Sequence, residues 1–376
     1  MAFPQTPQDG DKIGLPQDLG ESSLASVEES KIERPKRRVR YSGAHPRRFE
    51  DKYKERQPDK YPETTAKILA SGKTPAGTHR PICVREILEV LAPKAGETGL
   101  DATLGYGGHA VEILPCLRPD GKLLALDADA TELLKTEARL REQGFGPEEF
   151  VAKRRNFAGA LQFIFEQGLE GVDIIVADLG LSSMQIDNPG RGFTFKFDGP
   201  LDMRMNPARG EPATAIIARW NEATWERVLA ENADEPNARL ISRGLVETQT
   251  QHPIQTTRDL AVATRAALGG VRNDSRLPET EKTVRRVFQA VRIEVNDEFG
   301  ALETFLRNLP QCLRPGGRAA ILTFHSGEDR RVKKAFVNGL RNGQYLRAAD
   351  EVIRPSDEEL RSNPRAAAAK LRWATK

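Results

Sequence analysis

The stretch "DATLGYGGHA", residues 101–110, decides how this sequence is interpreted. An aspartate closes a strand-like segment, three glycines make a tight turn, and "GGHAVEIL" opens a helix. Glycines let the backbone approach a ligand closely, and the first turn of a helix presents free N–H groups to it. The pattern therefore predicts a ligand cradle between a strand and a helix.

A cofactor that contains a nucleoside fits this cradle. Asp127 in "LLALD" follows at the spacing at which an acid binds a ribose diol. Asp101 precedes the loop, where a carboxylate repels a pyrophosphate but attracts the sulfonium and ammonium groups of S-adenosylmethionine. The spacing Gly105-x-Gly107-Gly108 differs from a dehydrogenase fingerprint, and no Lys-Ser/Thr pair of a P-loop follows. We therefore expect S-adenosylmethionine, with an NAD-type oxidoreductase as the alternative.

Strand-like and helix-like segments alternate around this cradle. The expected strands are 99–104, 121–127, 149–156, 171–178 and 318–324. From about 187 to 285 the alternation stops and only helix-like segments follow, and one long helix is expected over 284–313. Strands that alternate with helices are typical of a parallel sheet covered on both faces. The predicted fold class is α/β and Rossmann-like, with an inserted all-α domain.

The pattern divides the chain into three parts. Residues 1–75 are rich in Pro, Gly, Ser and charge, so we expect a disordered or extended basic N-terminal arm. Its run "RPKRRVRYSGAHPRRFEDKYKER" is either an RNA-gripping segment or a solvated tail. Residues 76–188 and 286–376 are expected to form the α/β domain, and residues 189–285 a helical domain for substrate recognition.

Composition and cysteine usage set the broad class. The 376 residues carry 57 Lys and Arg against 54 Asp and Glu, a formal charge of +3 that says little about partners. Cys83, Cys116 and Cys312 lack any CxxC spacing, as in a reducing compartment. No apolar run is long enough for a membrane span, and the N-terminus has no signal core. We expect a cytoplasmic protein without membrane association and without a catalytic metal.

Four motifs then carry a resemblance to one family. They are "DIIVADLGLSSMQIDNPGRGFTFKFDGPLDMRM" (173–205), "RRVFQAVRIEVNDEF" (285–299), "TFHSGEDRRVKKAF" (323–336) and "NPRAAAAKLR" (363–372). In this order they resemble the bacterial 16S ribosomal RNA cytosine-N4 methyltransferases, the MraW or RsmH family, over about residues 79–376. One departure is Gly327, where the family's "HSLEDR" has leucine.

The resemblance implies a class I S-adenosylmethionine-dependent methyltransferase. Its expected substrate is the N4 amine of a specific cytosine in the decoding region (P site) of 16S ribosomal RNA, within the small ribosomal subunit. Methylation of another RNA or DNA amine, or an inactive rRNA-binding assembly factor with the same fold, remains the alternative. The sequence is also compatible with a homodimer. The resemblance implies these cofactor contacts: Gly107, Gly108, His109, Asp127, Phe157, Asp178 and Gln185.

Catalytic candidates follow from where the strands end. Cytosine N4 is a poor nucleophile, so an acceptor hydrogen-bonded to the amine helps to orient it and to take up its proton. Asp178, at the end of a buried strand, is the main candidate, with Ser182 and Ser183 assisting. His325 follows the fifth strand at the same edge. A purely cofactor-binding Asp178 and a structural His325 remain open alternatives.

Aromatic and cationic residues nearby are candidates for RNA contact. Phe193, Phe195 and Phe197 alternate, so they either stack on the target base or plug the space between the domains. Seven arginines provide positive charge for phosphates, although each is individually a candidate for a salt bridge. They are Arg191, Arg204, Arg285, Arg286, Arg292, Arg330 and Arg331.

Overall fold

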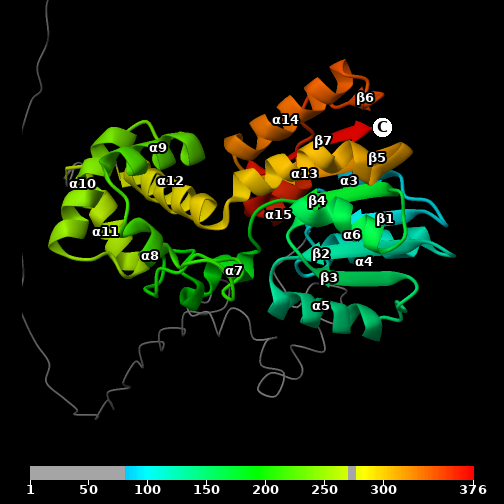
Figure 1. Ribbon diagram of the computed structural model, residues 1–376, viewed down its shortest axis with the longest axis horizontal. Coiled ribbons are helices and arrows are strands. Elements are labelled where there is room, and N and C mark those ends of the chain that lie inside the picture. The colour runs from blue at the N-terminus through cyan, green and yellow to red at the C-terminus, as the bar shows by residue number, and fades with distance from the viewer. Residues whose placement is uncertain (1–80, 270–276) are drawn as a thin grey trace, which may run out of the picture. The chain divides into compact units, whose positions relative to one another are not determined.

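The computed structural model describes residues 81–269 and 277–376 (Figure 1). Chain contacts divide the protein into Met1–His45 and Pro46–Lys376, and every described residue belongs to the second unit. The predicted basic arm, residues 1–75, lies outside the described residues. Within the described ranges, no helix is long and apolar enough to cross a membrane.

A seven-stranded sheet in the order β3-β2-β1-β4-β5-β7-β6 organises the α/β part. The strands are β1 (Thr98–Asp101), β2 (Lys122–Asp127), β3 (Phe150–Arg154), β4 (Val172–Asp178), β5 (Leu313–Thr323), β6 (Arg347–Ala348) and β7 (Lys370–Thr375). The first five are parallel, and β7 runs antiparallel to both β5 and β6. The five predicted strands are confirmed. Strand order reverses between β1 and β4, which places a ligand site at their carboxyl ends.

Helices cover both faces of this sheet (Figure 1). They are α3 (Val84–Leu91), α4 (Gly108–Leu117), α5 (Ala130–Glu142), α6 (Ala160–Glu166), α13 (Glu298–Cys312) and α14 (Ser326–Arg341). Alternate side chains of β2 enter different cores, because successive strand residues point to opposite faces. Leu124 packs in the core that contains Phe163, on α6, whereas Leu123 packs in the core that contains Ile113, on α4.

The inserted segment is helical and has a core of its own. It contains α8 (Ala213–Ile217), α9 (Glu222–Ala233), α10 (Ala238–Gln251), α11 (Thr257–Ala267) and α12 (Leu277–Asn296). Trp225 is fully buried in this core. The only β-structure in the described part of the insertion is an isolated bridge between Pro200 and Thr256. Helix α12 packs on the same core as far as Val295, beyond the predicted boundary at 285. The domain boundaries at 188 and 285 therefore stay predictions.

Three details of the prediction were wrong. The long helix over 284–313 is two helices, because Asp297 takes a left-handed conformation with φ 46° between α12 and α13. Residues 314–317, which precede the strand expected over 318–324, are an irregularity inside β5, which pairs with β4 at Leu313 and resumes at Arg318. The segment after α14, where no strand was expected, contains β6 and β7.

Candidate active site

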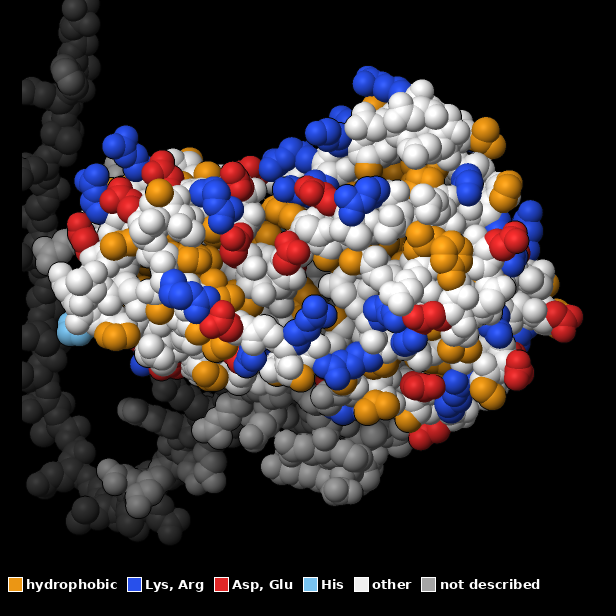
Figure 2. Space-filling view, viewed as in Figure 1, with side chains coloured by type: hydrophobic (Ala, Val, Ile, Leu, Met, Phe, Trp, Pro, Cys, Tyr) orange, Lys and Arg blue, Asp and Glu red, His pale blue; other side chains and the backbone are white. Residues whose placement is uncertain are grey.

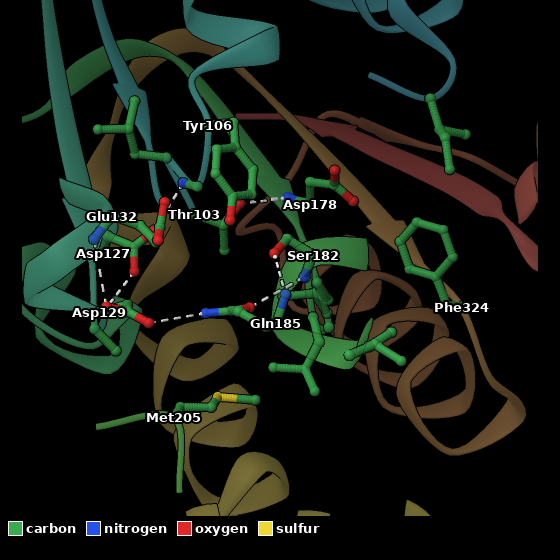
Figure 3. Close-up of a pocket in the computed structure, with 18 of the residues that line it drawn as sticks. Thr103, Tyr106, Asp127, Asp129, Glu132, Asp178, Ser182, Gln185, Met205 and Phe324 are labelled. Carbon is green, nitrogen blue, oxygen red and sulfur yellow. Dashed lines mark hydrogen bonds between the residues drawn. The ribbon is translucent and has the colours of Figure 1, made fainter. Parts of the chain in front are cut away.

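A cavity of about 620 Å³ lies at the carboxyl edge of the sheet (Figure 3). Its walls come from the ends of β2 and β4, from the glycine loop and from α12 of the insertion. Most predicted site residues line it: Gly105, Gly108, His109, Asp127, Phe157, Asp178, Ser182, Gln185 and His325. The fold thus brings together residues more than 200 positions apart.

Asp101 and Gly107 do not line the cavity. Asp101 is 2% exposed, and its Oδ1 accepts a hydrogen bond from Thr103 N at 3.0 Å. Burial raises the pKa of Asp101 to about 6, although the nearby His109 opposes the shift. Asp101 therefore lies behind the wall of the cavity and does not line it. The side chain of Ser183 lies outside what the structure describes, so its predicted role stays a prediction.

The glycine loop is held from behind by α5. Thr136 Oγ1 donates to the carbonyl of Gly105 at 2.7 Å, and the Arg139 guanidinium donates to the carbonyl of Tyr106. Gly107 has φ 67°, and a Cβ there would lie 2.8 Å from Thr136 Cγ2. This glycine is required by backbone conformation and by the close approach of α5, whereas Gly105 and Gly108 face the cavity.

Asp127 ends β2 and faces the cavity (Figure 3). Its Oδ2 accepts from Gly105 N and its Oδ1 from Asp129 N, both at 2.7 Å. Burial raises the pKa of Asp127 to about 6, and these two backbone N–H groups limit the rise. A carboxylate has about four lone-pair sites, so two remain for the hydroxyls of a ribose.

Asp178 and His109 form a pair at the other side of the cavity. The side chain of Asp178 is 30% exposed, and its Oδ2 lies 3.4 Å from His109 Nε2. The Nε2 atom is buried without a well-aligned hydrogen bond, so the contact is electrostatic. Burial lowers the pKa of His109, but Asp178 and Asp101 outweigh it and leave that pKa raised. Asp178 N donates to Thr103 Oγ1 at 2.7 Å, which joins the ends of β4 and β1.

Ser182 and Gln185 form the capping box of the short helix α7 (Ser183–Asp187). Ser182 Oγ accepts from Gln185 N at 3.2 Å, and Gln185 Oε1 accepts from Ser182 N at 3.1 Å. Gln185 Nε2 also donates to Asp129 Oδ2 at 3.3 Å (Figure 3). The S-x-x-Q spacing is a capping-box signal that the sequence analysis did not use. These contacts favour a positioning role for Ser182.

His325 caps α14. Its Nδ1 accepts from Glu328 N at 3.4 Å, and its Nε2 faces Glu328 Oε1 at 3.2 Å. Burial would raise the pKa of Glu328, but His325 and the nearby Arg292 outweigh burial and lower it. An imidazole that accepts at one nitrogen carries its proton on the other. Both nitrogens of His325 thus face Glu328, although Nε2 makes no well-aligned hydrogen bond, and this arrangement favours the structural alternative for this residue.

The sequence analysis missed Asp129 and the partner that it holds. Asp129 is 4% exposed, and its Oδ2 accepts from Arg191 Nη1 at 2.9 Å. Burial raises the pKa of Asp129, but the hydrogen bond from Arg191 outweighs burial and lowers it. Arg191 Nη2 also donates to the carbonyl of Met205, whose side chain lines the cavity (Figure 3). The second acid of "LDAD" was the only sequence signal for this link.

The structure shows where the aromatic candidates for RNA contact lie and which of the cationic candidates are already paired within the protein. Phe193 and Phe195 belong to the core of the insertion itself, and none of the three phenylalanines lines the cavity, so a plug between the domains stays a prediction. Most of the seven arginines form ion pairs within the protein: Arg191, Arg204, Arg286, Arg292, Arg330 and Arg331. Arg285 and Lys196 are exposed at the cavity and have no ion pair to any described carboxylate.

Folding also brings together three side chains of metal-ligating types, and their spacing in the sequence did not reveal this cluster. Potential ligand atoms of Cys83, Glu86 and Glu359 lie within 4.8 Å of one another. Both carboxylate oxygens of Glu359 accept from Cys83 N, and burial raises the pKa of the Cys83 thiol to about 12. A protonated thiol is a poor metal ligand.

Sheet order and site together define the class of protein. Five parallel strands with an antiparallel β7, a glycine turn after β1 and acids at the ends of β2 and β4 form a Rossmann-like, S-adenosylmethionine-dependent methyltransferase. The chain belongs to the MraW methylase family, whose model matches residues 76–376.

Curated relatives agree with this assignment. The chain is 50% identical to "Ribosomal RNA small subunit methyltransferase H 1" of Lachnoclostridium phytofermentans over 342 residues, 91% of this chain and 93% of that protein. It is also 50% identical to "Ribosomal RNA small subunit methyltransferase H 2" of Alkaliphilus metalliredigens, over 92% of this chain and 98% of that protein. The first match is about 40 residues longer than the family region, so it also includes part of the sequence before residue 76.

Proposed function

We propose that this protein methylates the N4 amine of a specific cytosine in the decoding region (P site) of 16S ribosomal RNA, within the small ribosomal subunit. The names of its relatives support a small-subunit rRNA substrate. The observation that carries the proposal is that Asp127 and Asp178, on strands either side of β1, face one cavity.

The residues of the cavity fit S-adenosylmethionine. Asp127 has free lone pairs for the ribose hydroxyls, and Phe157, held edge-on by Phe305 at 5.6 Å, offers an aromatic surface to adenine. The buried Nε2 of His109, 3.4 Å from Asp178 Oδ2, and the carboxylate of Asp178 lie at the other side. When bound, the cofactor supplies a methyl group that its sulfonium centre has already activated.

Asp178 then acts on the acceptor. Its partly exposed carboxylate accepts a hydrogen bond from the cytosine amine, which orients the nitrogen toward the methyl donor. The amine loses a proton as the new bond forms, and Asp178 takes it up directly or through water. Ser182 holds the loop after β4 in place through the cap of α7.

The insertion presents the substrate. A target base reaches such a pocket only when it is unstacked or single-stranded. Lys196 and Arg285, both on the insertion side of the cavity, are free to bind the flanking phosphates.

The test is methyl transfer to native small subunits from a strain that lacks this activity. Digestion and mass spectrometry should locate one N4-methylated cytidine in the decoding region. A methyl group on a different nucleotide or nucleic acid would favour the other-substrate alternative. Tight rRNA binding without any transfer would favour the inactive assembly factor.

A further inference from the structure

Helix α14 turns only positive charge toward solvent. All sixteen of its residues are described, and its exposed charged residues are Arg330, Lys333, Lys334 and Arg341. Figure 2 shows Lys and Arg side chains gathered over this helix. Such a surface differs from the nearly balanced charge of the whole chain.

The acids of α14 are used inside the protein. Glu328 is 4% exposed and accepts from Phe324 N at 2.8 Å. Asp329 is 8% exposed and accepts from Arg372 Nε at 2.7 Å and Lys370 Nζ at 3.0 Å. Because these carboxylates are buried and paired, they do not neutralise the outer face of the helix.

Carboxylates on neighbouring elements are also occupied. Asp234, at the end of α9, pairs with Arg330 through both oxygens, at 2.8 and 2.9 Å. Glu303 on α13 pairs with Arg331 at 2.9 Å. In the described part of the chain, no carboxylate lies within ion-pair distance of Lys333, Lys334 or Arg341. We call these three residues the basic strip.

The basic strip leads away from the active-site cavity. His325, which caps α14, lines that cavity. At 1.5 Å per residue, the strip lies about 12 to 24 Å further along the helix axis. A polyanion whose reactive part enters the cavity would therefore meet the strip along the same helix.

We propose that the basic strip binds the phosphate backbone of the RNA whose target base enters the cavity. This inference rests on the proposed function and adds a docking surface to it. Uncompensated lysines are typical of phosphate contacts, whereas lysine is depleted in protein–protein interfaces. The strip therefore fits an RNA backbone better than a protein partner.

The test compares two variants that each remove two charges. Lys333→Gln/Lys334→Gln changes the strip, and Lys94→Gln/Lys122→Gln is the control, at the opposite, amino edge of the sheet. Affinity for protein-free small-subunit rRNA is measured over a range of salt concentrations. The strip variant should bind roughly tenfold more weakly at low salt, with a salt slope reduced by about 2, one for each lysine.

The control variant should keep wild-type RNA affinity, and both variants should keep wild-type affinity for S-adenosylmethionine. Unchanged RNA affinity and salt slope in the strip variant would overturn the proposal, as would an equal loss in the control. A loss seen with native subunits but absent with protein-free RNA would assign the strip to a protein partner instead. If the wild type binds rRNA but transfers no methyl group, the proposed function fails while the strip is still tested.

Discussion

Two aspartates, the buried Asp101 and the half-buried Asp127, shape the chemistry of the cavity at the level of single residues. Burial raises the pKa of each to about 6, so each carboxylate is less favourable at neutral pH than an exposed one. Asp127 faces the cavity and has hydrogen-bonding capacity left for a ligand, whereas Asp101 lies behind the wall. We therefore predict different consequences when each of these two aspartates is replaced by asparagine.

Asp127→Asn and Asp127→Ala should weaken binding of S-adenosylmethionine. Losing two charge-assisted hydrogen bonds to a ribose corresponds to about 3 kcal/mol, or on the order of a hundredfold in Kd. Isothermal titration calorimetry measures this directly. Wild-type affinity in both variants would remove the ribose assignment, provided that circular dichroism shows a folded protein.

Asp101→Asn should stabilise the ligand-free protein relative to wild type, and increasingly so as pH rises from about 4 to above 6. The folded-state pKa of about 6 lies above the unfolded value, so this group favours folding at low pH and loses that contribution as pH rises through 6. The full difference for one group is about 3 kcal/mol. Urea unfolding at pH 4, 5.5 and 7.5 measures it. The exposed Asp120→Asn is the control, and identical pH profiles for Asp101→Asn and wild type would contradict the argument.

The sequence predicted site residues where strand geometry alone decides position. Asp127 and Asp178 are the last residues of parallel strands, so both had to reach one edge of the sheet. The link between Asp129 and Arg191 depends on how the insertion folds back over the sheet, and 62 residues separate the two partners. The contact between His325 and Glu328 was not predicted for a related reason, because Glu328 becomes buried only when α14 packs.

At the scale of elements, α5 fixes the conformation of the glycine loop. Its Thr136 and Arg139 hold two carbonyls of the loop, and its side chains fill the space beside Gly107. Contacts with α5 therefore help to determine the conformation of the glycine loop, in addition to any contact with a ligand.

Gly107→Ala should weaken cofactor binding and lower the free energy of unfolding by about 2 kcal/mol or more, since a positive φ and a 2.8 Å clash add together. Gly96→Ala is a matched control, because Gly96 has φ 79° with nothing within 4 Å of the added Cβ. The control should cost only about 1 kcal/mol and leave the cofactor Kd unchanged. Equal losses in the two variants would show that α5 does not confine the loop.

Local sequence patterns predicted the helices and strands better than the breaks within them. Strands β2 and β4 are buried apolar runs, and such runs are visible in the sequence. The break at Asp297 was not visible, because aspartate gives only a weak signal for a left-handed residue. Strand β7 was missed because it forms by pairing with β5, about fifty residues earlier in the chain.

At the scale of the whole molecule, Arg191 connects the insertion to the sheet. It binds Asp129, next to the end of β2, and the carbonyls of Arg204 and Met205. This arrangement fixes the insertion's wall of the cavity relative to the cofactor-binding edge.

Arg191→Ala should lower kcat/KM for the RNA substrate more than it changes cofactor affinity, since the wall that receives the base loses its anchor. Losing the ion pair with the buried Asp129 costs about 3 kcal/mol of stability, although Gln185 still donates a hydrogen bond to that carboxylate. A double-mutant cycle with Asp129→Asn measures the coupling by urea unfolding and by kinetics. Additive effects in that cycle would show that the pair does not act as a unit.

The most direct test of the central claim is a crystal structure of the protein with S-adenosylhomocysteine. We predict that the ribose hydroxyls contact Asp127, that adenine lies against Phe157, and that the sulfur lies on the side of Asp178. A ligand bound outside this cavity, or one that leaves Asp127 and Asp178 on opposite sides of a protein wall, would contradict the account.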